Sequence, residues 1–177
     1  MESRTLRTVG CLLALLCACA AASGAEKTLI AHGGAWRVKD KAVWTDGGFG
    51  PKLIAKGTDF ADGQAGVELY FADAKPGNAG LIVHVNQPRI GADNFIGYEI
   101  ALDPEHQHLR IGRHKNNFSL MKDIKTTVPL KRWIPLVVRI KNGLIEVDVD
   151  GKLVASMKDD KGFLPGGAVG LRPWQRK

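Results

Sequence analysis

Hydrophobic and polar residues alternate through most of this chain, and this two-residue period limits what the chain can fold into. The alternation starts at Trp36, and no later segment carries an apolar stripe over three helical turns. Successive side chains of a β-strand point to opposite faces, so each alternating segment predicts a strand with one buried face. The segments that show this pattern are residues 66–71, 81–86, 98–103, 108–114, 134–140 and 145–149.

Turn signals separate these segments. Asn142-Gly143 and Asp150-Gly151 each follow a strand pattern, and such pairs favour tight hairpins because both residues adopt positive φ. Further turn clusters lie at residues 46–48, 62–63, 75–78 and 164–167. Many short strands with almost no helix predict an all-β fold, a two-sheet antiparallel β-sandwich of the jelly-roll type.

The first residues have a different composition and look like an export signal. Arg4 and Arg7 precede an apolar segment, residues 11–22, that is too short to span a bilayer, and small residues follow it. We therefore expect a signal peptide at 1–24 and one β-sandwich domain at 25–177. The mature protein is expected to be secreted or periplasmic, with no membrane span.

All three cysteines lie inside the expected signal, at positions 11, 17 and 19. The mature chain would then have neither disulfides nor thiolate metal sites, so its stability must come from a packed core. About 150 residues are enough to form such a core. A lipid anchor at Cys19 is the alternative, and it is disfavoured because Cys17 stands where a small or branched residue is usual.

The distribution of positive charge along the chain argues against nucleic acid as a partner. Loss of residues 1–24 removes two arginines and one glutamate, which lowers the net charge from +7 to +6. The remaining cationic residues are scattered, and aromatic residues are not interleaved with them as stacking platforms would be. Weak attraction to an anionic polysaccharide or an acidic envelope fits this moderately basic surface better, although excess charge more often serves solubility alone.

Six short segments carry a family resemblance. They are Trp36-Arg37-Val38 to Trp44, Ala79 to Val83, Gly97 to Ile100, Arg132-Trp133, Val149 to Lys152 and Gly167 to Arg172. The mature chain resembles the 3-keto-disaccharide hydrolase domain family of the concanavalin A-like lectin and glucanase superfamily (LamG-like jelly rolls). The resemblance implies hydrolysis of the glycosidic bond of an oxidised disaccharide. It also implies a further strand after residues 167–172, so the sandwich is expected to lack its last strand.

The favoured candidate site lies on three consecutive predicted strands, residues 79–86, 96–103 and 107–114. The outward face is expected to collect His84, Asn86, Glu99, Asp103, His108, Arg110 and His114. Such a cluster forms a sugar-sized polar cleft if this face is concave, and Arg110 would then orient Glu99 and lower its pKa. A solvated sheet face with cross-strand ion pairs is the alternative.

The catalytic candidates are Glu99, His84 and Arg110. A 3-keto group acidifies the neighbouring C2 hydrogen, so Glu99 or His84 as base would promote elimination followed by hydration. The substrate-binding candidates supply hydrogen-bond donors at the sheet rim and an aromatic face for a sugar ring. These candidates are Asn86, Arg113, His114, Asn116, Asn117 and Trp174. An ordinary polar loop beside a packed tryptophan is the alternative for the rim.

Two other clusters are less favoured. Glu146, Asp148 and Asp150 are superficially similar to the catalytic strand of family-16 glucanases, but Asp150 is expected in a turn and the final glutamate is absent. We expect exposed strand residues here, and calcium binding stays open. His106 and His108 lack a third ligand fixed by spacing, so neither a metal site nor a cofactor is predicted.

The residues therefore predict an exported, carbohydrate-recognising β-sandwich. The resemblance favours an enzyme, a glycoside hydrolase acting on 3-keto-disaccharides. A non-catalytic sugar-binding module and an interaction domain of a larger exported protein are the alternatives.

Overall fold

The computed structural model describes residues 28–40, 42–74 and 77–175, so the predicted signal peptide lies outside the described residues. No helix in this part of the chain is long and apolar enough to cross a membrane. The strands are β1 (Leu29–His32), β2 (Trp36–Lys39), β3 (Ala42–Thr45), β4 (Lys52–Phe60), β5 (Gly63–Tyr70), β6 (Gly77–Asn86), β7 (Ile96–Asp103), β8 (His108–Lys115), β9 (Phe118–Lys125), β10 (Trp133–Lys141), β11 (Leu144–Val149), β12 (Lys152–Lys158) and β13 (Gly167–Gln175).

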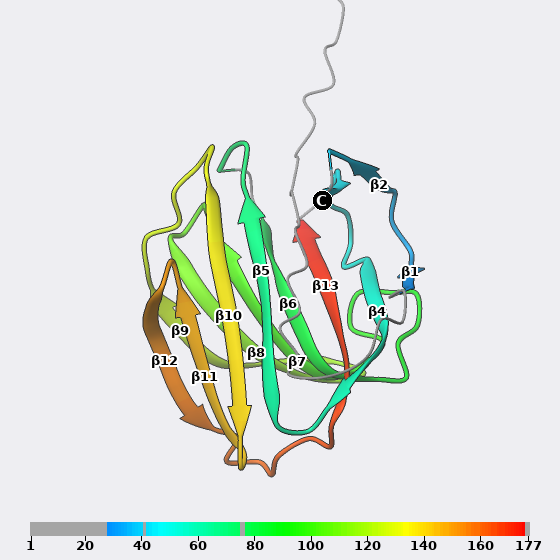
Figure 1. The fold of residues 1–177 in the computed structure, drawn as a ribbon, viewed down its shortest axis with the longest axis vertical. Helices are drawn as coiled ribbons and strands as arrows, with labels where there is room; N and C mark the ends of the chain where they lie inside the picture. The colour runs from blue at the N-terminus through cyan, green and yellow to red at the C-terminus, as the bar shows by residue number, and fades with distance from the viewer. Residues whose placement is uncertain (1–27, 41, 75–76, 176–177) are drawn as a thin grey trace, which may run out of the picture.

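These strands form two packed antiparallel sheets, which confirms the predicted β-sandwich (Figure 1). The large sheet has seven strands in the order β1-β4-β13-β6-β7-β8-β9, and the small sheet has four in the order β12-β11-β10-β5. A separate hairpin pairs β2 with β3. Neighbours in the large sheet are often distant in sequence, so its centre depends on long-range pairing.

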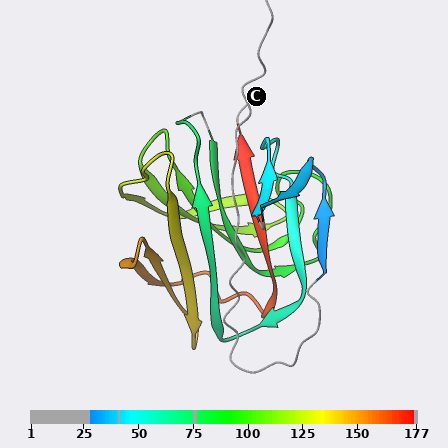
Figure 2. The ribbon, with the colours of Figure 1, turned by 45° about the horizontal axis from the view of Figure 1, so that its top comes forward.

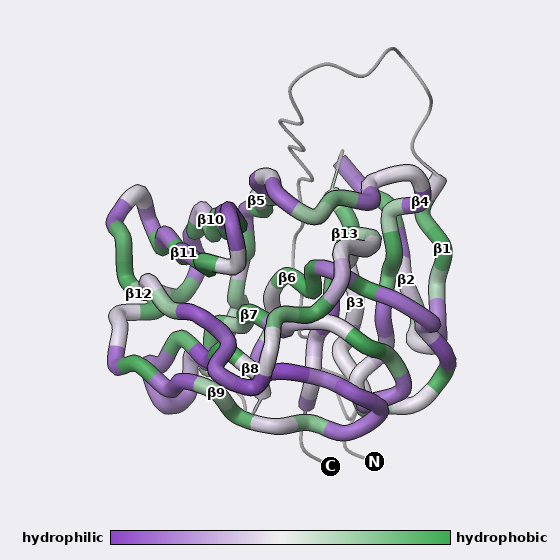
Figure 3. The backbone as a smooth tube through the Cα atoms, turned by 90° about the horizontal axis from the view of Figure 1, so that it is seen from below, coloured by the Kyte–Doolittle hydropathy of each residue, from purple (hydrophilic) through white to green (hydrophobic). Residues whose placement is uncertain are grey.

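The core lies between the two sheets. It contains Leu69 and Val67 of β5, Leu81 of β6 and Ile100 of β7, all at most 3% exposed. The colours of Figure 3 change repeatedly along the strands, in keeping with this alternation. Burial of these side chains stabilises the fold by about 25 cal/mol for each Å² of apolar surface removed from water. The expectation of one buried face holds for β5, β10 and β11, whereas β6 and β7 are buried on both faces, and Ile82 and Val85 pack with Ile54 and Phe95 in a second cluster.

The two predicted hairpin turns also form. Asn142 (φ 49°) and Gly143 (φ 75°) join β10 to β11, and Asp150 (φ 54°) and Gly151 (φ 76°) join β11 to β12. Positive φ at both central positions matches the twist of the flanking strands.

The carboxylates of β11 decorate the outside of the sandwich, as expected. Arg139 of β10 pairs with Asp148 at 2.6 Å and with Glu146 at 3.8 Å. Asp150 lies in the turn and pairs with Arg132. Exposed ion pairs of this kind contribute at most about 1 kcal/mol each.

The C-terminal part of the described chain is a central strand. Residues 167–175 form β13, which pairs with β4 on one side and β6 on the other. The further strand that the resemblance implies after residues 167–172 stays a prediction. Figure 2 shows the red β13 beside the cyan β4. Both edges of β13 are thus occupied, and this strand carries Arg172 and Trp174 at the centre of the large sheet.

Candidate functional site: a pocket on the outer face of the large sheet

A pocket of about 350 Å³ lies on the face of the large sheet that is turned away from the small sheet. Because Tyr98, Ile100 and Leu102 of β7 face the core, Glu99 between them faces this pocket. Strands β6, β7, β8, β9 and β13 contribute to it, together with loops on either side. The lining residues are Phe49, Asn78, Ala92, Asp93, Glu99, Arg110, Gly112, Phe118, Arg172 and Trp174.

Small residues keep the floor of the pocket low between two arginines. Arg172 of β13 is opposite Gly80 of β6, Gly80 is opposite Ala101 of β7, and Ala101 is opposite Arg110 of β8. A Cβ atom at Gly80 would lie 1.9 Å from the carbonyl oxygen of Ile100, so no larger residue fits without moving the backbone. This row of four paired residues therefore places the guanidinium groups of Arg172 and Arg110 on opposite sides of a shallow floor.

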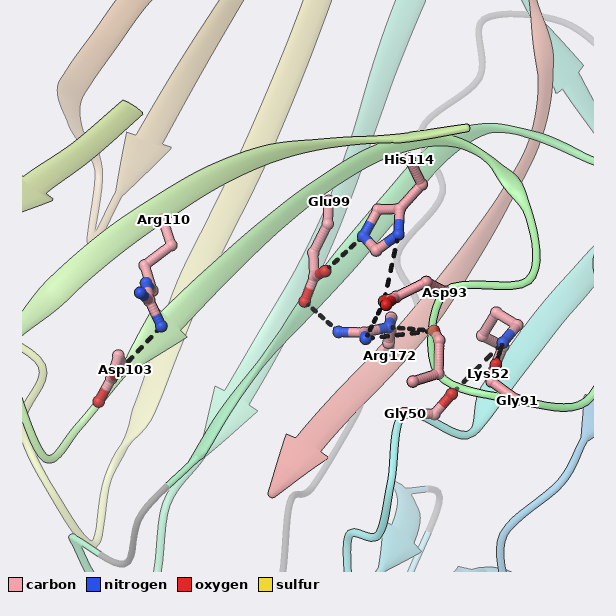
Figure 4. Close-up of polar contacts among 10 residues, drawn as sticks. Gly50, Lys52, Gly91, Asp93, Glu99, Asp103, Arg110, His114 and Arg172 are labelled. Carbon is pink, nitrogen blue, oxygen red and sulfur yellow. Dashed lines mark hydrogen bonds and ion pairs between the residues drawn. The ribbon is translucent and has the colours of Figure 1, made fainter. Parts of the chain in front are cut away.

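Glu99 is clamped at the base of the pocket by two nitrogen donors (Figure 4). Its Oε1 accepts a hydrogen bond from Arg172 Nη1 at 2.7 Å, and its Oε2 accepts one from His114 Nε2 at 2.8 Å. Burial alone would raise the pKa of Glu99, but the charge of Arg172 and the His114 hydrogen bond hold it below its ordinary value. Glu99 is therefore a fixed anion.

Arg172 also connects the clamp to the loop between β6 and β7. Its Nε and Nη2 donate to the carbonyl oxygen of Ala92, each at 3.2 Å, and Nη2 lies 3.3 Å from Asp93 Oδ1. The His114 ring stacks on Phe95 of the same loop with a centroid separation of 4.1 Å, and its Nδ1 lies 3.6 Å from Asp93 Oδ1. These contacts place the carboxylate of Asp93 above Glu99, at the side of the pocket.

Lys52 joins the two loops that border the pocket. This fully buried residue at the start of β4 donates from Nζ to the carbonyl oxygens of Gly50 at 3.3 Å and Gly91 at 2.5 Å. Its Nζ also lies 5.5 Å from the centre of the Phe95 ring. One ammonium group therefore holds the β3–β4 loop against the β6–β7 loop.

We expect this lysine to make stability depend on pH. Burial, and secondarily the charge of Arg172, lower the pKa of Lys52 to about 8 against an ordinary value of 10.5, although Asp93 and Glu99 oppose the shift. Between these values the unfolded chain retains a proton that the folded chain has released, so stability rises with pH. From pH 7.5 to 9.5 the gain in unfolding free energy should be about 1–2 kcal/mol.

Urea unfolding of the wild type and Lys52→Met at both pH values measures this gain. The variant should lack it, since methionine does not titrate. An equal pH response in both proteins would contradict a titrating Lys52.

Aromatic side chains form the walls of the pocket. Phe49 of the β3–β4 loop is 60% exposed, Phe118 of β9 is 40% exposed, and Trp174 of β13 is half-buried. Gly112 leaves room for the Phe118 side chain, because a Cβ atom at residue 112 would lie 2.1 Å from the phenyl ring. Aromatic faces around a polar floor are suited to a ligand with both apolar and hydroxyl-bearing surfaces.

Arg110 lines the pocket but does not orient Glu99, so that expectation is wrong. Its guanidinium lies 3.8 Å from Asp103 and 3.7 Å from Asp123. The opposite-charge partner of Glu99 is Arg172, which comes from a strand more than 50 residues later in the chain. Arg110 Nε is a buried atom without a hydrogen-bond partner among the described residues, and its ion-pair contact is with Asp123 at 3.7 Å.

A family model, the 3-keto-alpha-glucoside-1,2-lyase-like domain, matches residues 24–176 of this sequence. The chain belongs to this family. Among curated proteins no relative matches the sequence.

Solved structures show the same fold as this lyase-like domain. The carbohydrate-binding module CBM66 from Bacillus subtilis is 16% identical with a TM-score of 0.73, over 83% of this chain and 88% of that one. The β-glucanase of Bacillus licheniformis is 9% identical with a TM-score of 0.55, over 97% of this chain and 86% of that one. The concanavalin A-like jelly roll predicted from the sequence is thereby confirmed.

His84 lies outside the pocket of the lyase-like domain, contrary to expectation. A register shift between Val83 and Asn86, with His84 at φ 55°, reverses the alternation at the end of β6. The imidazole is fully buried, 5.2 Å from both the Phe60 and the Phe163 rings, and its nitrogens contact the carbonyl oxygens of Ala61 and Leu164. Burial lowers its pKa despite these contacts.

Arg113 and Asn86 also have structural partners away from the pocket. Arg113 faces the core side and donates to Asp159 at 2.5 Å, and Tyr98 donates to the same carboxylate oxygen at 2.9 Å. The Asn86 amide donates to the carbonyl oxygens of His84 and Gly166, both at 3.1 Å. These residues therefore anchor the chain between β12 and β13.

The remaining rim candidates have different positions. Asn116 (φ 59°) and Asn117 form the exposed turn between β8 and β9 and are not among the residues that line the pocket. His114 lies beneath the pocket and contacts Glu99. Glu99, Arg110 and Trp174 line the pocket itself.

The sequence prediction missed Arg172 as a partner of Glu99, and it missed Asp93, Phe49 and Lys52 altogether. The sequence signal that could have identified Arg172 is the two-residue alternation around Leu171, which places Arg172 on the polar face. Asp93 and Phe49 lie in glycine-containing loops, where no periodicity assigns a face.

One carboxylate cluster beside the pocket closes a turn. Ligand atoms of Asp103, Glu105 and His106 lie within 4.8 Å of one another. Asp103 Oδ1 accepts the backbone N–H groups of Glu105 and His106, and Oδ2 lies 3.0 Å from His106 Nδ1. These contacts account for the cluster as the link between β7 and β8.

Proposed function

We propose that the pocket binds a carbohydrate and that the protein cleaves glycosides of 3-keto sugars. The observation that carries this proposal is the combination of three aromatic walls with a guanidinium and carboxylate floor around about 350 Å³. Sugar rings have apolar faces that stack on aromatic rings and hydroxyl groups that need charged or polar partners. The family description, a 3-keto-alpha-glucoside-1,2-lyase-like domain, supports the same substrate class.

The cleavage would proceed by elimination. A base takes the proton from C2, whose acidity the neighbouring 3-keto group raises, and the electron pair forms the enolate of that ketone. The enolate then forms the C1–C2 double bond as the C1–O bond breaks, and the leaving oxygen takes a proton. Water adds to the double bond and yields the free 3-keto sugar. A guanidinium beside the ketone oxygen would stabilise the developing negative charge.

Asp93 is better placed than Glu99 to act as the base. Both oxygens of Glu99 are occupied by Arg172 and His114, and its lowered pKa makes it a weak proton acceptor. Asp93 uses Oδ1 for its contacts with Arg172 and His114, and its side chain is 38% exposed at the pocket wall. Glu99 would instead accept hydrogen bonds from the sugar or hold Arg172 in position.

Mass spectrometry of reactions with 3-keto glucosides and their unmodified counterparts, disaccharides included, tests the activity. Release of a 3-keto monosaccharide from the oxidised substrate alone supports the elimination. No turnover by folded protein, with sugar binding retained, favours a binding module, the function to which the clamped state of Glu99 points. Absence of both turnover and binding contradicts the proposal.

Trp174→Ala should weaken sugar binding about ten-fold, because the loss of about 50 Å² of buried apolar contact at 25 cal/mol for each Å² costs about 1.3 kcal/mol. Isothermal titration calorimetry with a 3-keto glucoside measures the loss. Trp133→Ala is the matched control, since Trp133 packs on Tyr70 of the small sheet at 5.4 Å. Equal losses in both variants would argue against stacking at Trp174.

We also propose that the protein acts outside the cytoplasm, on the strength of the export-signal pattern in residues 1–24. N-terminal sequencing of the protein recovered from the medium or periplasm should find a chain that starts near residue 25. A chain recovered intact from the cytoplasm would contradict export.

A further inference from the structure

A second, smaller hollow adjoins the pocket, and we propose that it binds the apolar leaving group of the glycoside. This inference rests on the proposed function, since it assigns the sugar ring to the first pocket. The hollow has a volume of about 180 Å³ and shares Phe49 with the first pocket. Its lining residues are His32, Gly33, Gly34, Gly48, Phe49, Pro51, Ile90 and Gly91.

A ridge between the two loops separates the hollow from the first pocket. Gly50 and Ala92 meet there so closely that a Cβ atom on Gly50 would lie 2.8 Å from the Cα atom of Ala92. Lys52 holds the ridge together through Gly50 and Gly91, as Figure 4 shows. One loop thus supplies Ile90 and Gly91 to the hollow and Ala92 and Asp93 to the first pocket.

This arrangement places the expected cleavage point at the ridge. A glycoside with its sugar in the first pocket and its leaving group in the hollow would cross the ridge near Asp93. The carboxylate proposed to take the C2 proton would then lie beside the bond that breaks. Proximity of this kind between base and scissile bond is a requirement of the elimination.

The chemistry of the hollow favours an apolar occupant. Four glycines and Pro51 make much of its wall, and its side chains include no carboxylate, lysine or arginine. His32 is the polar side chain there, and burial and the charge of Lys52 lower its pKa, so the imidazole is neutral at neutral pH. A second sugar would bury several hydroxyl groups with few partners, and each unpaired group costs about 1–3 kcal/mol.

Exposed hydrophobic side chains at the hollow support the same assignment. Ile90 is 74% exposed and Phe49 is 60% exposed. An aromatic or alicyclic leaving group would cover parts of both side chains, and removal of apolar surface from water stabilises the complex. A methyl group is too small to reach both of them.

Calorimetric titration with the methyl and phenyl 3-keto-α-glucosides tests the proposal, and it is carried out in the Asp93→Asn background so that the ligand is not consumed. The phenyl compound should bind about ten-fold tighter, because about 50–60 Å² of additional apolar surface is buried at 25 cal/mol for each Å². Ile90→Ser should reduce this preference to about three-fold or less and leave the affinity for the methyl compound unchanged. Leu153→Ser is the matched control, since Leu153 is 58% exposed on β12 of the small sheet.

The outcomes distinguish this inference from the proposed function. Equal binding of both glucosides, or an equal loss of both in Ile90→Ser, overturns the leaving-group site while sugar binding stands. Binding of neither compound by folded protein that carries Asp93→Asn alone overturns the sugar pocket and the leaving-group site with it. A phenyl preference that Leu153→Ser retains and Ile90→Ser loses supports the assignment.

Discussion

Arg172→Met is expected to lower the free energy of unfolding by about 3–5 kcal/mol, because it leaves Glu99 buried without its main counter-charge. Both side chains are only 4% exposed, and their 2.7 Å contact lies at the centre of the large sheet. Loss of Arg172 also removes the donors to the carbonyl oxygen of Ala92. Urea unfolding followed by tryptophan fluorescence measures the change.

Arg110→Met is the matched control for this prediction. Arg110 lines the same pocket, but it is 29% exposed and its ion pairs are 3.7 and 3.8 Å long, so the expected loss is below about 1 kcal/mol. The double variant Arg172→Met with Glu99→Leu should recover part of the loss, since no buried carboxylate is left unpaired. Equal losses in the two single variants would show that the Glu99 clamp contributes little to stability.

Asp93→Asn is expected to reduce turnover of a 3-keto glucoside by about 10²–10⁴-fold, the usual contribution of a general base. Asparagine has nearly the same shape and its Oδ1 still accepts the hydrogen bond from Arg172, so sugar affinity should change less than about three-fold. Turnover is measured by mass spectrometry and affinity by calorimetry on the same preparations.

Two control variants are needed to interpret this result. Asp123→Asn changes a carboxylate beside Arg110 that does not line the pocket, and it should leave turnover within about two-fold. Glu99→Gln tests the base that the sequence suggested, and it should weaken stability and binding together because it disturbs the clamp. Retained turnover in Asp93→Asn with full loss in Glu99→Gln would return the role of base to Glu99.

The alternation of polar and apolar residues within single strands predicted much of this fold and part of the site. The two-residue period placed Tyr98 in the core and Glu99 on the opposite face, and it placed Arg110 and His114 on the same face as Glu99. These assignments needed only the geometry of single strands and the short links between β6, β7 and β8. Cross-strand register then follows, since a one-residue slip would exchange the two faces.

His84 shows where local pattern fails. The two-residue period predicts that His84 and Asn86 share the face of Glu99. The backbone instead adopts positive φ at His84, which turns its side chain to the other face. The bulged position is not a glycine, so the sequence carries no strong signal of the positive φ there. The same bulge moved Asn86 into the structural network around β13, whereas Arg113 has the parity of Leu109 and Ile111, so the regular period itself places it on the core side.

A second limit of sequence-based prediction is distance along the chain, and it applies to Arg172, Asp93 and Lys52. Arg172 meets Glu99 because β13 inserts between β4 and β6, and the order of strands in a sheet does not follow from their alternation. Asp93 and Lys52 act through loops whose contacts are long-range. The clamp could be recognised only after the sheet had been assembled.

The position of β13 has a consequence for biosynthesis. Translation delivers the strands in numerical order, so β4 and β6 emerge long before the strand that lies between them. Until residues 167–175 leave the ribosome, two strand edges stay unpaired and Glu99 has no guanidinium partner. Assembly of the pocket therefore waits for β13, and truncation products that lack this strand would have open edges prone to aggregation.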